Sequence, residues 1–305
     1  MNAYGRMAGD GFLPTWTEEG EGAALYGLTA DNPTLALGGD VRFLHIQRRK
    51  AGLFSEKKFL MQADIEPALE IGRLVVATQF GLFADRSFAV RRAYGLYRLP
   101  VKGMLLRAGR FIPNYGINLP NHTALIRDAL GFGQGTEVEG VELGYITGIG
   151  EAYLHGFKGA LREGFATRLG WFITPTYHVG INGLWERIAE DTYRTVGGLF
   201  AFLAPTSTFW ILSEADWETS YDAYGYYSKG RGIGLLSFGH DLAPGWQVGL
   251  GFQGTVNDRF DTVSKAGVSL AWIPRPHMEV SWDYGLQKEG NKVGTSSLII
   301  LHYWL

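Results

Sequence analysis

The residues able to do covalent or metal chemistry are dispersed along this 305-residue chain. A serine nucleophile needs an adjacent histidine to activate it, but the sequence contains no G-x-S-x-G element and no H-E-x-x-H or similar metal-ligand spacing. The glycine cluster at 131–135 lacks the Lys-Ser/Thr pair that completes a phosphate-binding loop. The 7 histidines lie in separate segments, at His45, His122, His155, His178, His240, His277 and His302. The sequence therefore predicts no catalytic residues, no metal and no cofactor.

Two carboxylate pairs have spacings that a catalytic acid and base could use. Glu214 and Asp216 are two positions apart in the sequence, and Glu279 and Asp283 are four positions apart. Even spacings on a β-strand place both side chains on one face. The same pairs are therefore also expected to line one side of a sheet.

Composition indicates many strands. The 43 glycines are about 14% of the chain, roughly twice ordinary usage, and aromatic residues are another 14%. The absence of cysteine excludes disulfides, Cys-ligated zinc, Fe–S clusters and covalent haem within this chain. A net charge of -2 gives no electrostatic footprint for nucleic acid. Residues 1–20 show no signal-peptide pattern, which implies either no export or a signal already removed.

Several segments alternate strictly between apolar and polar residues, the period of a strand. In 60–70, Gln62, Asp64, Glu66 and Glu70 oppose Met61, Ala63, Ile65 and Leu69. The segments 73–82, 246–253, 265–272 and 278–284 repeat the pattern. A soluble sandwich would alternate too, but the polar faces here carry Gly and Gln rather than the Lys and Glu of soluble surfaces. The pattern favours a barrel with a polar lumen and a lipid-facing outer wall.

About sixteen strands of roughly ten residues are expected, the length that spans a membrane when tilted. Their expected ranges are 35–47, 58–70, 73–83, 88–98, 103–110, 137–146, 151–158, 166–174, 176–186, 192–203, 207–217, 231–240, 245–255, 261–273, 276–286 and 295–305. The uncharged stretch 195–213 is interrupted by Pro205 and is expected to be two strands and a turn rather than a helix. Tight turns alternate with longer polar connections such as 48–57 and 218–230, as in outer-membrane barrels.

The end of the chain supports this architecture. Ser297, Ile299, Leu301, Tyr303 and Leu305 alternate up to the last residue, which gives the ending LHYWL. This segment resembles the C-terminal recognition strand of Gram-negative outer-membrane β-barrels, although Leu305 stands where that family most often has Phe. An ordinary final strand would show the same alternation.

The long segment 111–136 carries too many apolar residues for a freely solvated loop, namely Phe111, Tyr115, Leu119, Ile126 and Phe132. Residues 122–130 are expected to form a short helix. The stretch 107–145 resembles the region of the constricting loop in porin-like proteins, including relatives of the phosphate-selective porins. That resemblance implies a loop folded into the barrel, with pore-lining residues Asn114, Asn121, His122, Arg127 and Asp128. A cap outside the barrel, or packing against a partner, is the alternative.

The assigned faces place a mildly acidic set of side chains in the lumen, which does not favour phosphate selectivity. These predicted lining residues are Gln62, Asp64, Glu66, Gln79, Arg91, Glu142, Arg168, Glu214, Asp216, Lys265, Glu279 and Asp283. Mutual pairing of these charges into a structural network is the other interpretation.

Together these patterns predict an all-β, transmembrane, antiparallel up-and-down barrel formed by residues 35–305, preceded by a periplasmic extension or plug at 1–34. The predicted function is a Gram-negative outer-membrane porin through which small polar solutes or ions diffuse, with both termini periplasmic. Expected partners are outer-membrane lipid or lipopolysaccharide, the permeating solutes, and a periplasmic or lumen-inserted protein. The alternatives are a structural sleeve or anchor of a larger complex, such as an electron-transfer conduit, and a lipid-acting barrel enzyme.

Overall fold

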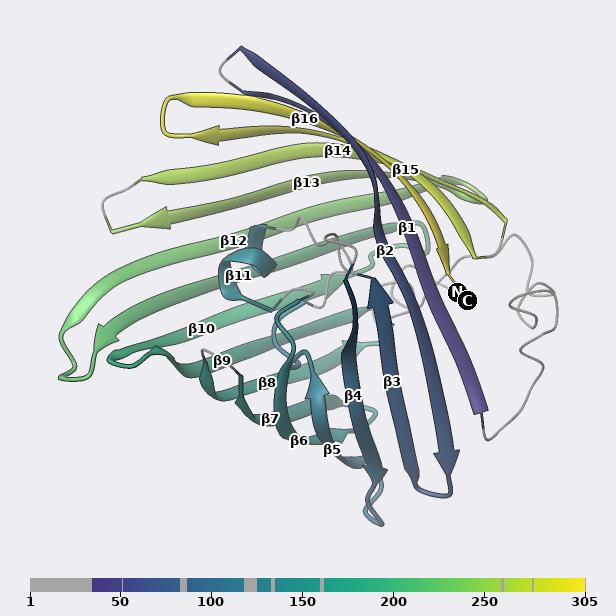
Figure 1. The fold of residues 1–305 in the computed structure, drawn as a ribbon, viewed down its shortest axis with the longest axis vertical. Coiled ribbons are helices and arrows are strands. Elements are labelled where there is room, and N and C mark those ends of the chain that lie inside the picture. The colour runs from purple at the N-terminus through teal and green to yellow at the C-terminus, as the bar shows by residue number, and fades with distance from the viewer. Residues whose placement is uncertain are drawn as a thin grey trace.

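The computed structural model describes residues 35–50, 52–82, 87–117, 125–132, 135–159, 162–258, 261–275 and 277–304. Within these ranges the chain forms a closed antiparallel barrel of sixteen strands and one short helix (Figure 1). The elements are β1 Leu35–Lys50, β2 Leu53–Ile71, β3 Leu74–Leu82, β4 Phe88–Arg98, β5 Met104–Phe111, α2 Leu125–Leu130, β6 Val138–Ile146, β7 Gly150–Lys158, β8 Glu163–Thr174, β9 Tyr177–Ala189, β10 Thr192–Leu203, β11 Phe209–Asp222, β12 Tyr227–Ala243, β13 Trp246–Asn257, β14 Thr262–Arg275, β15 Met278–Glu289 and β16 Lys292–Trp304. The all-β barrel and its strand number are confirmed.

Each strand pairs with its neighbours in sequence, and the barrel closes where β1 pairs with β16, from Asp40 opposite Trp304 to Lys50 opposite Gly294. Because the strand number is even, the start of β1 and the end of β16 lie at the same end of the barrel. We call this end the terminus rim, and the opposite end, which carries the β1–β2 and β5–β6 connections, the loop rim. Residues 195–213 form β10, a turn and β11, as expected. Among the described residues, no helix has the length and apolar character needed to cross a membrane.

The two faces of the wall differ as the alternation predicts. Outward side chains are large, apolar and exposed, for example Ile65, Leu199, Phe252 and Trp282. Inward side chains include buried polar residues, for example Gln62 and Asp64 on either side of the outward Ala63, and an apolar cluster of Leu44, Ile46 and Leu298 on β1 and β16. An exposed apolar outer wall around a polar interior is the arrangement required in lipid.

The strands extend further at the loop rim than the sequence predicted. The expected loops 48–57 and 218–230 are short turns, because β1 and β2 stay paired up to Lys50 and Leu53, and β11 and β12 up to Tyr221 and Tyr227. The predicted boundaries were wrong here for a physical reason. Alternation ends where both faces of a strand become polar, whereas backbone hydrogen bonding continues past that point.

The described parts of the segment between β5 and β6, residues 112–117 and 125–132, lie inside the barrel and include α2, which confirms the expected short helix (Figure 1). Its apolar side chains are almost fully buried against inward residues of the wall. The resulting core contains Tyr115, Ile126, Leu130 and Phe132 of the segment and Val138, Phe157, Ala166, Leu184, Val196, Ile233 and Leu235 of β6–β12. The hydrophobic residues that argued against a solvated loop are therefore those that hold it inside.

Candidate functional site: a loop docked inside the barrel

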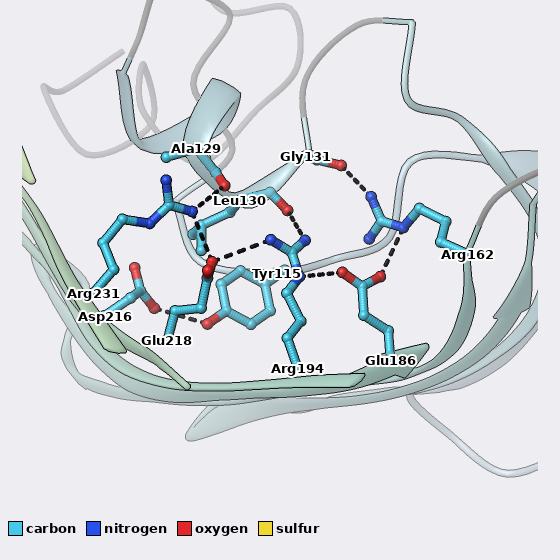
Figure 2. A network of polar contacts seen from close by, with 10 residues as sticks. All are labelled: Tyr115, Ala129, Leu130, Gly131, Arg162, Glu186, Arg194, Asp216, Glu218 and Arg231. Carbon is cyan, nitrogen blue, oxygen red and sulfur yellow. Dashed lines mark hydrogen bonds and ion pairs between the residues drawn. The ribbon is translucent and has the colours of Figure 1, made fainter. Parts of the chain in front are cut away.

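The centre of the docked loop is a tyrosine that reaches the wall. The Tyr115 hydroxyl donates a hydrogen bond to Asp216 Oδ1 at 2.8 Å (Figure 2). The Tyr115 ring stacks on Phe132 with centroids 4.8 Å apart. Only 1% of Tyr115 is exposed. Burial, together with the neighbouring charge of Asp216, raises the pKa of the Tyr115 phenol above its ordinary value, so it stays a neutral donor.

The two backbone amides after Tyr115 also bond to the wall. The Gly116 N–H donates to Asn182 Oδ1 at 3.0 Å, and the Ile117 N–H donates to Glu214 Oε2 at 2.8 Å. Gly116 has a φ of +56°, and a Cβ at this position would overlap the Glu214 carboxylate. Only glycine combines this conformation with so close an approach.

Three arginines from different parts of the wall converge on the C-terminal end of α2 (Figure 2). Arg231 donates to the Ala129 carbonyl at 2.9 Å, Arg194 to Leu130 at 2.7 Å and Arg162 to Gly131 at 2.6 Å. The last carbonyls of a helix have no intrahelical partner and carry partial negative charge. The three guanidinium groups therefore satisfy carbonyls that would otherwise be buried without hydrogen bonds.

Two buried glutamates connect these arginines. Glu186 accepts from both Arg162, at 2.7 Å, and Arg194, while Glu218 accepts from Arg194 at 3.1 Å and from Arg231 at 2.7 Å. The charges thus alternate along the wall and compensate one another. Removing any one member of this network would leave a buried charge without its partner, which would strongly destabilise the structure.

Arg127 of α2 lies within the docked loop rather than facing open lumen. Its guanidinium donates to the Tyr115 carbonyl at 3.0 Å and lies 3.9 Å from Glu214. Burial lowers the pKa of Arg127, an effect that the Glu214 charge opposes. Asn114 donates to Glu142 Oε1 at 3.1 Å, where Arg107 also binds at 2.8 Å. Asn121, His122 and the side chain of Asp128, predicted as lining residues, lie outside the described part of the chain.

A second polar network occupies the wall of β2–β4, and five predicted lining residues meet there. Asp64 accepts hydrogen bonds from Gln62 and from Gln79, the latter at 2.8 Å, and pairs with Arg91 at 3.2 Å. Gln79 also donates to Glu66 at 2.6 Å. These inward positions come together because they lie on consecutive paired strands.

The remaining predicted lining residues are inward but scattered. Arg168 pairs with Glu151 at 2.7 Å, a partner the sequence did not single out. Glu279 lies 4.0 Å from His302, which also contacts Asp40 at 3.1 Å. Lys265 and Asp283 occupy the neighbouring strands β14 and β15.

The residues that dock the loop were largely missed. Arg162, Glu186, Arg194, Glu218 and Arg231 were not predicted, and Tyr115 was counted only as an apolar loop residue. A usable signal existed for Glu186 and Arg194. Both face inward on neighbouring strands, and they lie directly opposite each other, since Arg194 pairs with Glu186.

Solved structures share this architecture. The loop-deletion variant of OmpT, an outer-membrane protein of Vibrio cholerae, superposes with a TM-score of 0.73 at 10% identity, covering 89% of this chain and 99% of that one. The outer-membrane channel DcaP of Acinetobacter baumannii gives 0.67 at 13% identity, covering 90% and 99%. The anion-selective porin of Comamonas acidovorans gives 0.69 at 9% identity, covering 89% and 99%.

Sequence comparison adds nothing to this structural likeness. No protein-family model and no curated protein matches the sequence. At identities of 9–13% the likeness concerns the path of the backbone rather than any particular side chain. The chain has the closed 16-strand barrel fold of bacterial outer-membrane porins and channels.

Proposed function

We propose that this protein is an outer-membrane channel through which ions and small polar solutes diffuse, with the docked loop as its constriction. The observation that carries the proposal is the one-sided anchoring of the loop. Among the described residues, its apolar core and its hydrogen bonds join it to β6–β12, and beyond β12 it reaches β13, where Gln253 accepts a hydrogen bond from the Leu125 amide. The inward face from β14 through β16 to β4 carries polar groups such as Asp64, Arg91 and Asp283 beside an apolar cluster of Leu44, Ile46 and Leu298. Its polar groups suit a water-filled passage.

Pairing of the wall charges sets the expected selectivity. Six arginines on the loop side, Arg107, Arg127, Arg162, Arg168, Arg194 and Arg231, each lie within 4.0 Å of a carboxylate. Opposite charges this close present little net field to a passing ion. Size exclusion with weak charge preference is therefore the proposed mechanism.

Conductance of the refolded protein in a planar bilayer tests the proposal. Because the chain has no cysteine, Asn114→Cys creates a single thiol beside the proposed constriction. A bulky thiol reagent should lower conductance through this variant, but not through the control Leu199→Cys, whose site faces outward. A folded but silent barrel would refute the channel and support the structural sleeve.

The orientation follows from the same proposal. The longest connection between strands, from β5 to β6, leaves the loop rim. Because the longer loops of outer-membrane barrels are extracellular and their short turns periplasmic, we place the terminus rim in the periplasm. Single cysteines at Lys102, in the β4–β5 turn, and at Tyr224, in the β11–β12 turn, test this assignment. A membrane-impermeant reagent on intact cells should label only the Tyr224 site, and labelling of the Lys102 site alone would reverse the orientation.

A further inference from the structure

We infer that one sector of the loop rim, on the outer face of β1, β2 and β15, binds the phosphate of a lipid head group. The sector is strongly basic, although the chain as a whole has a net charge of -2. Arg48, Arg49, Lys50, Lys57 and Lys58 flank the β1–β2 turn with only Glu56 among them. Lys288 and Lys292 lie in the adjoining β15–β16 hairpin, together with Glu289, which pairs with Lys50 at 2.7 Å. Elsewhere on the described rim the arginines Arg162, Arg187 and Arg231 are paired with glutamates, and Glu190, Asp191, Asp222 and Asp258 add negative charge.

Strand parity separates the cations that face lipid from those that face the lumen. Leu44 and Ile46 are buried inside the wall, so Phe43, His45, Gln47 and Arg49 of β1 point outward. Lys58 pairs with His45, and Phe54 with Arg49, so both share the outer face. On β15 the outward positions are Trp282, Tyr284, Leu286 and Lys288.

We define the basic rim patch as Arg49, Lys58 and Lys288 with the apolar residues Phe54 and Val293. All five are exposed, Phe54 to 63% and Val293 to 58%. Lys58 lies 3.3 Å from Glu56. Arg49 and Lys288 have no ion pair among the described residues, so their charges are available to a ligand.

The position of the patch selects lipid rather than a soluble anion. Lys288 is the next outward residue after Leu286, which belongs to the exposed apolar wall, and two residues of strand span only about 7 Å. Cations at this height lie level with head groups when the apolar wall is in hydrocarbon. Phe54 and Val293 between them suit the boundary between head groups and acyl chains, where apolar and cationic residues together bind anionic lipid.

Brominated lipids test the inference, because bromine quenches tryptophan fluorescence on contact. The purified barrel in non-ionic detergent is titrated with brominated phosphatidylglycerol and, separately, with brominated phosphatidylcholine. Trp282 lies on the same outer face, six residues before Lys288. We expect tighter binding of phosphatidylglycerol, weakened by added salt.

The variant Arg49→Gln/Lys58→Gln/Lys288→Gln should weaken phosphatidylglycerol binding by about 100- to 200-fold, given roughly a fivefold effect per basic residue. The control Arg73→Gln/Lys102→Gln/Arg275→Gln removes three exposed cations from the terminus rim and should leave binding unchanged. Phosphatidylcholine binding should be the same in all three proteins.

Three results would overturn the inference: equal binding of both lipids to the native protein, an unchanged triple variant, or an equal loss in the control. Retention of a soluble sulfated polysaccharide by the patch, without lipid preference, would assign it to a polymer instead. If the triple variant fails to fold, Arg49→Gln/Lys288→Gln, at the two positions without ion pairs, gives the same test. Bilayer conductance of each variant is recorded in parallel, so failure here is distinguishable from failure of the channel.

Discussion

Replacing Tyr115 by Phe removes one oxygen atom from the contact between the loop and the wall. The ring still stacks on Phe132, so the main loss is the 2.8 Å hydrogen bond to Asp216. A hydrogen bond to a charged group contributes about 1.5–3 kcal/mol. The population in which the loop leaves the wall should therefore rise about 10- to 150-fold, since each 1.4 kcal/mol is a factor of ten.

A single thiol under the loop measures this population. Ala166 lies inside the wall on β8, is 1% exposed and packs in the core that the loop covers. In a cysteine-free chain, Ala166→Cys reacts with a thiol reagent only when the loop lifts. Its labelling rate should increase by the same 10- to 150-fold when Tyr115→Phe is added.

The control is Tyr221→Phe, which makes the same chemical change elsewhere. Tyr221 accepts a hydrogen bond from Trp185 at 2.8 Å, and no hydrogen bond or ring contact joins it to the described part of the loop. When Tyr221→Phe is added to Ala166→Cys, the thiol should be labelled at the same rate as in Ala166→Cys alone. An unchanged rate in Tyr115→Phe, or an equal increase in the control, would refute the role of the Tyr115 hydroxyl in docking.

Further substitutions test other parts of the structure. Gly116→Ala should raise labelling of the same thiol, because it forces an unfavourable φ and a clash with a carboxylate; normal labelling would contradict the close approach. Arg194→Met should destabilise docking by about 3–5 kcal/mol through unpaired buried carboxylates, seen as increased current noise in bilayers. Leu199→Arg on the exposed outer wall should lower the free energy of unfolding in lipid by about 2–4 kcal/mol, measured by urea titration, if the site is near the bilayer midplane. The raised pKa of Tyr115 adds stability that is complete below the ordinary tyrosine pKa of about 10 and is lost as pH rises through the higher folded value. The thermal unfolding midpoint should therefore decrease as the pH is raised beyond ~10. This decrease should be less steep in the Tyr115→Phe variant.

The wall was predictable because its pattern is local. A period of two assigns each side chain to a face without knowledge of its neighbours, and Ile65, Phe252 and Trp282 are outward as expected. The network around Asp64 was also within reach. Its members lie on β2, β3 and β4, which pair in sequence order, so face and adjacency together bring them into contact.

The docking of the loop was not predictable in the same way. Arg162, Arg194 and Arg231 are far from α2 in sequence and bind backbone carbonyls, which leave no trace in side-chain pattern. Tyr115 contributes through its hydroxyl as well as its ring, and hydropathy records only the ring. The apolar content of the loop indicated burial, but it did not indicate which wall would receive it.

The charge of the lumen shows why selectivity cannot be obtained by counting residues. The predicted lining set is acidic, with Glu214 and Asp216 among its members, yet Glu214 accepts the Ile117 amide and Asp216 accepts the Tyr115 hydroxyl. Both carboxylates are thus committed to holding the loop, and the arginines that dock α2 are committed to Glu186 and Glu218. Charged side chains that are paired in this way affect the shape of the passage more than its electrostatic field. The ions that cross should therefore be discriminated mainly by size, and a strong preference for either sign in a salt gradient would mean that unpaired groups on the opposite wall dominate the constriction.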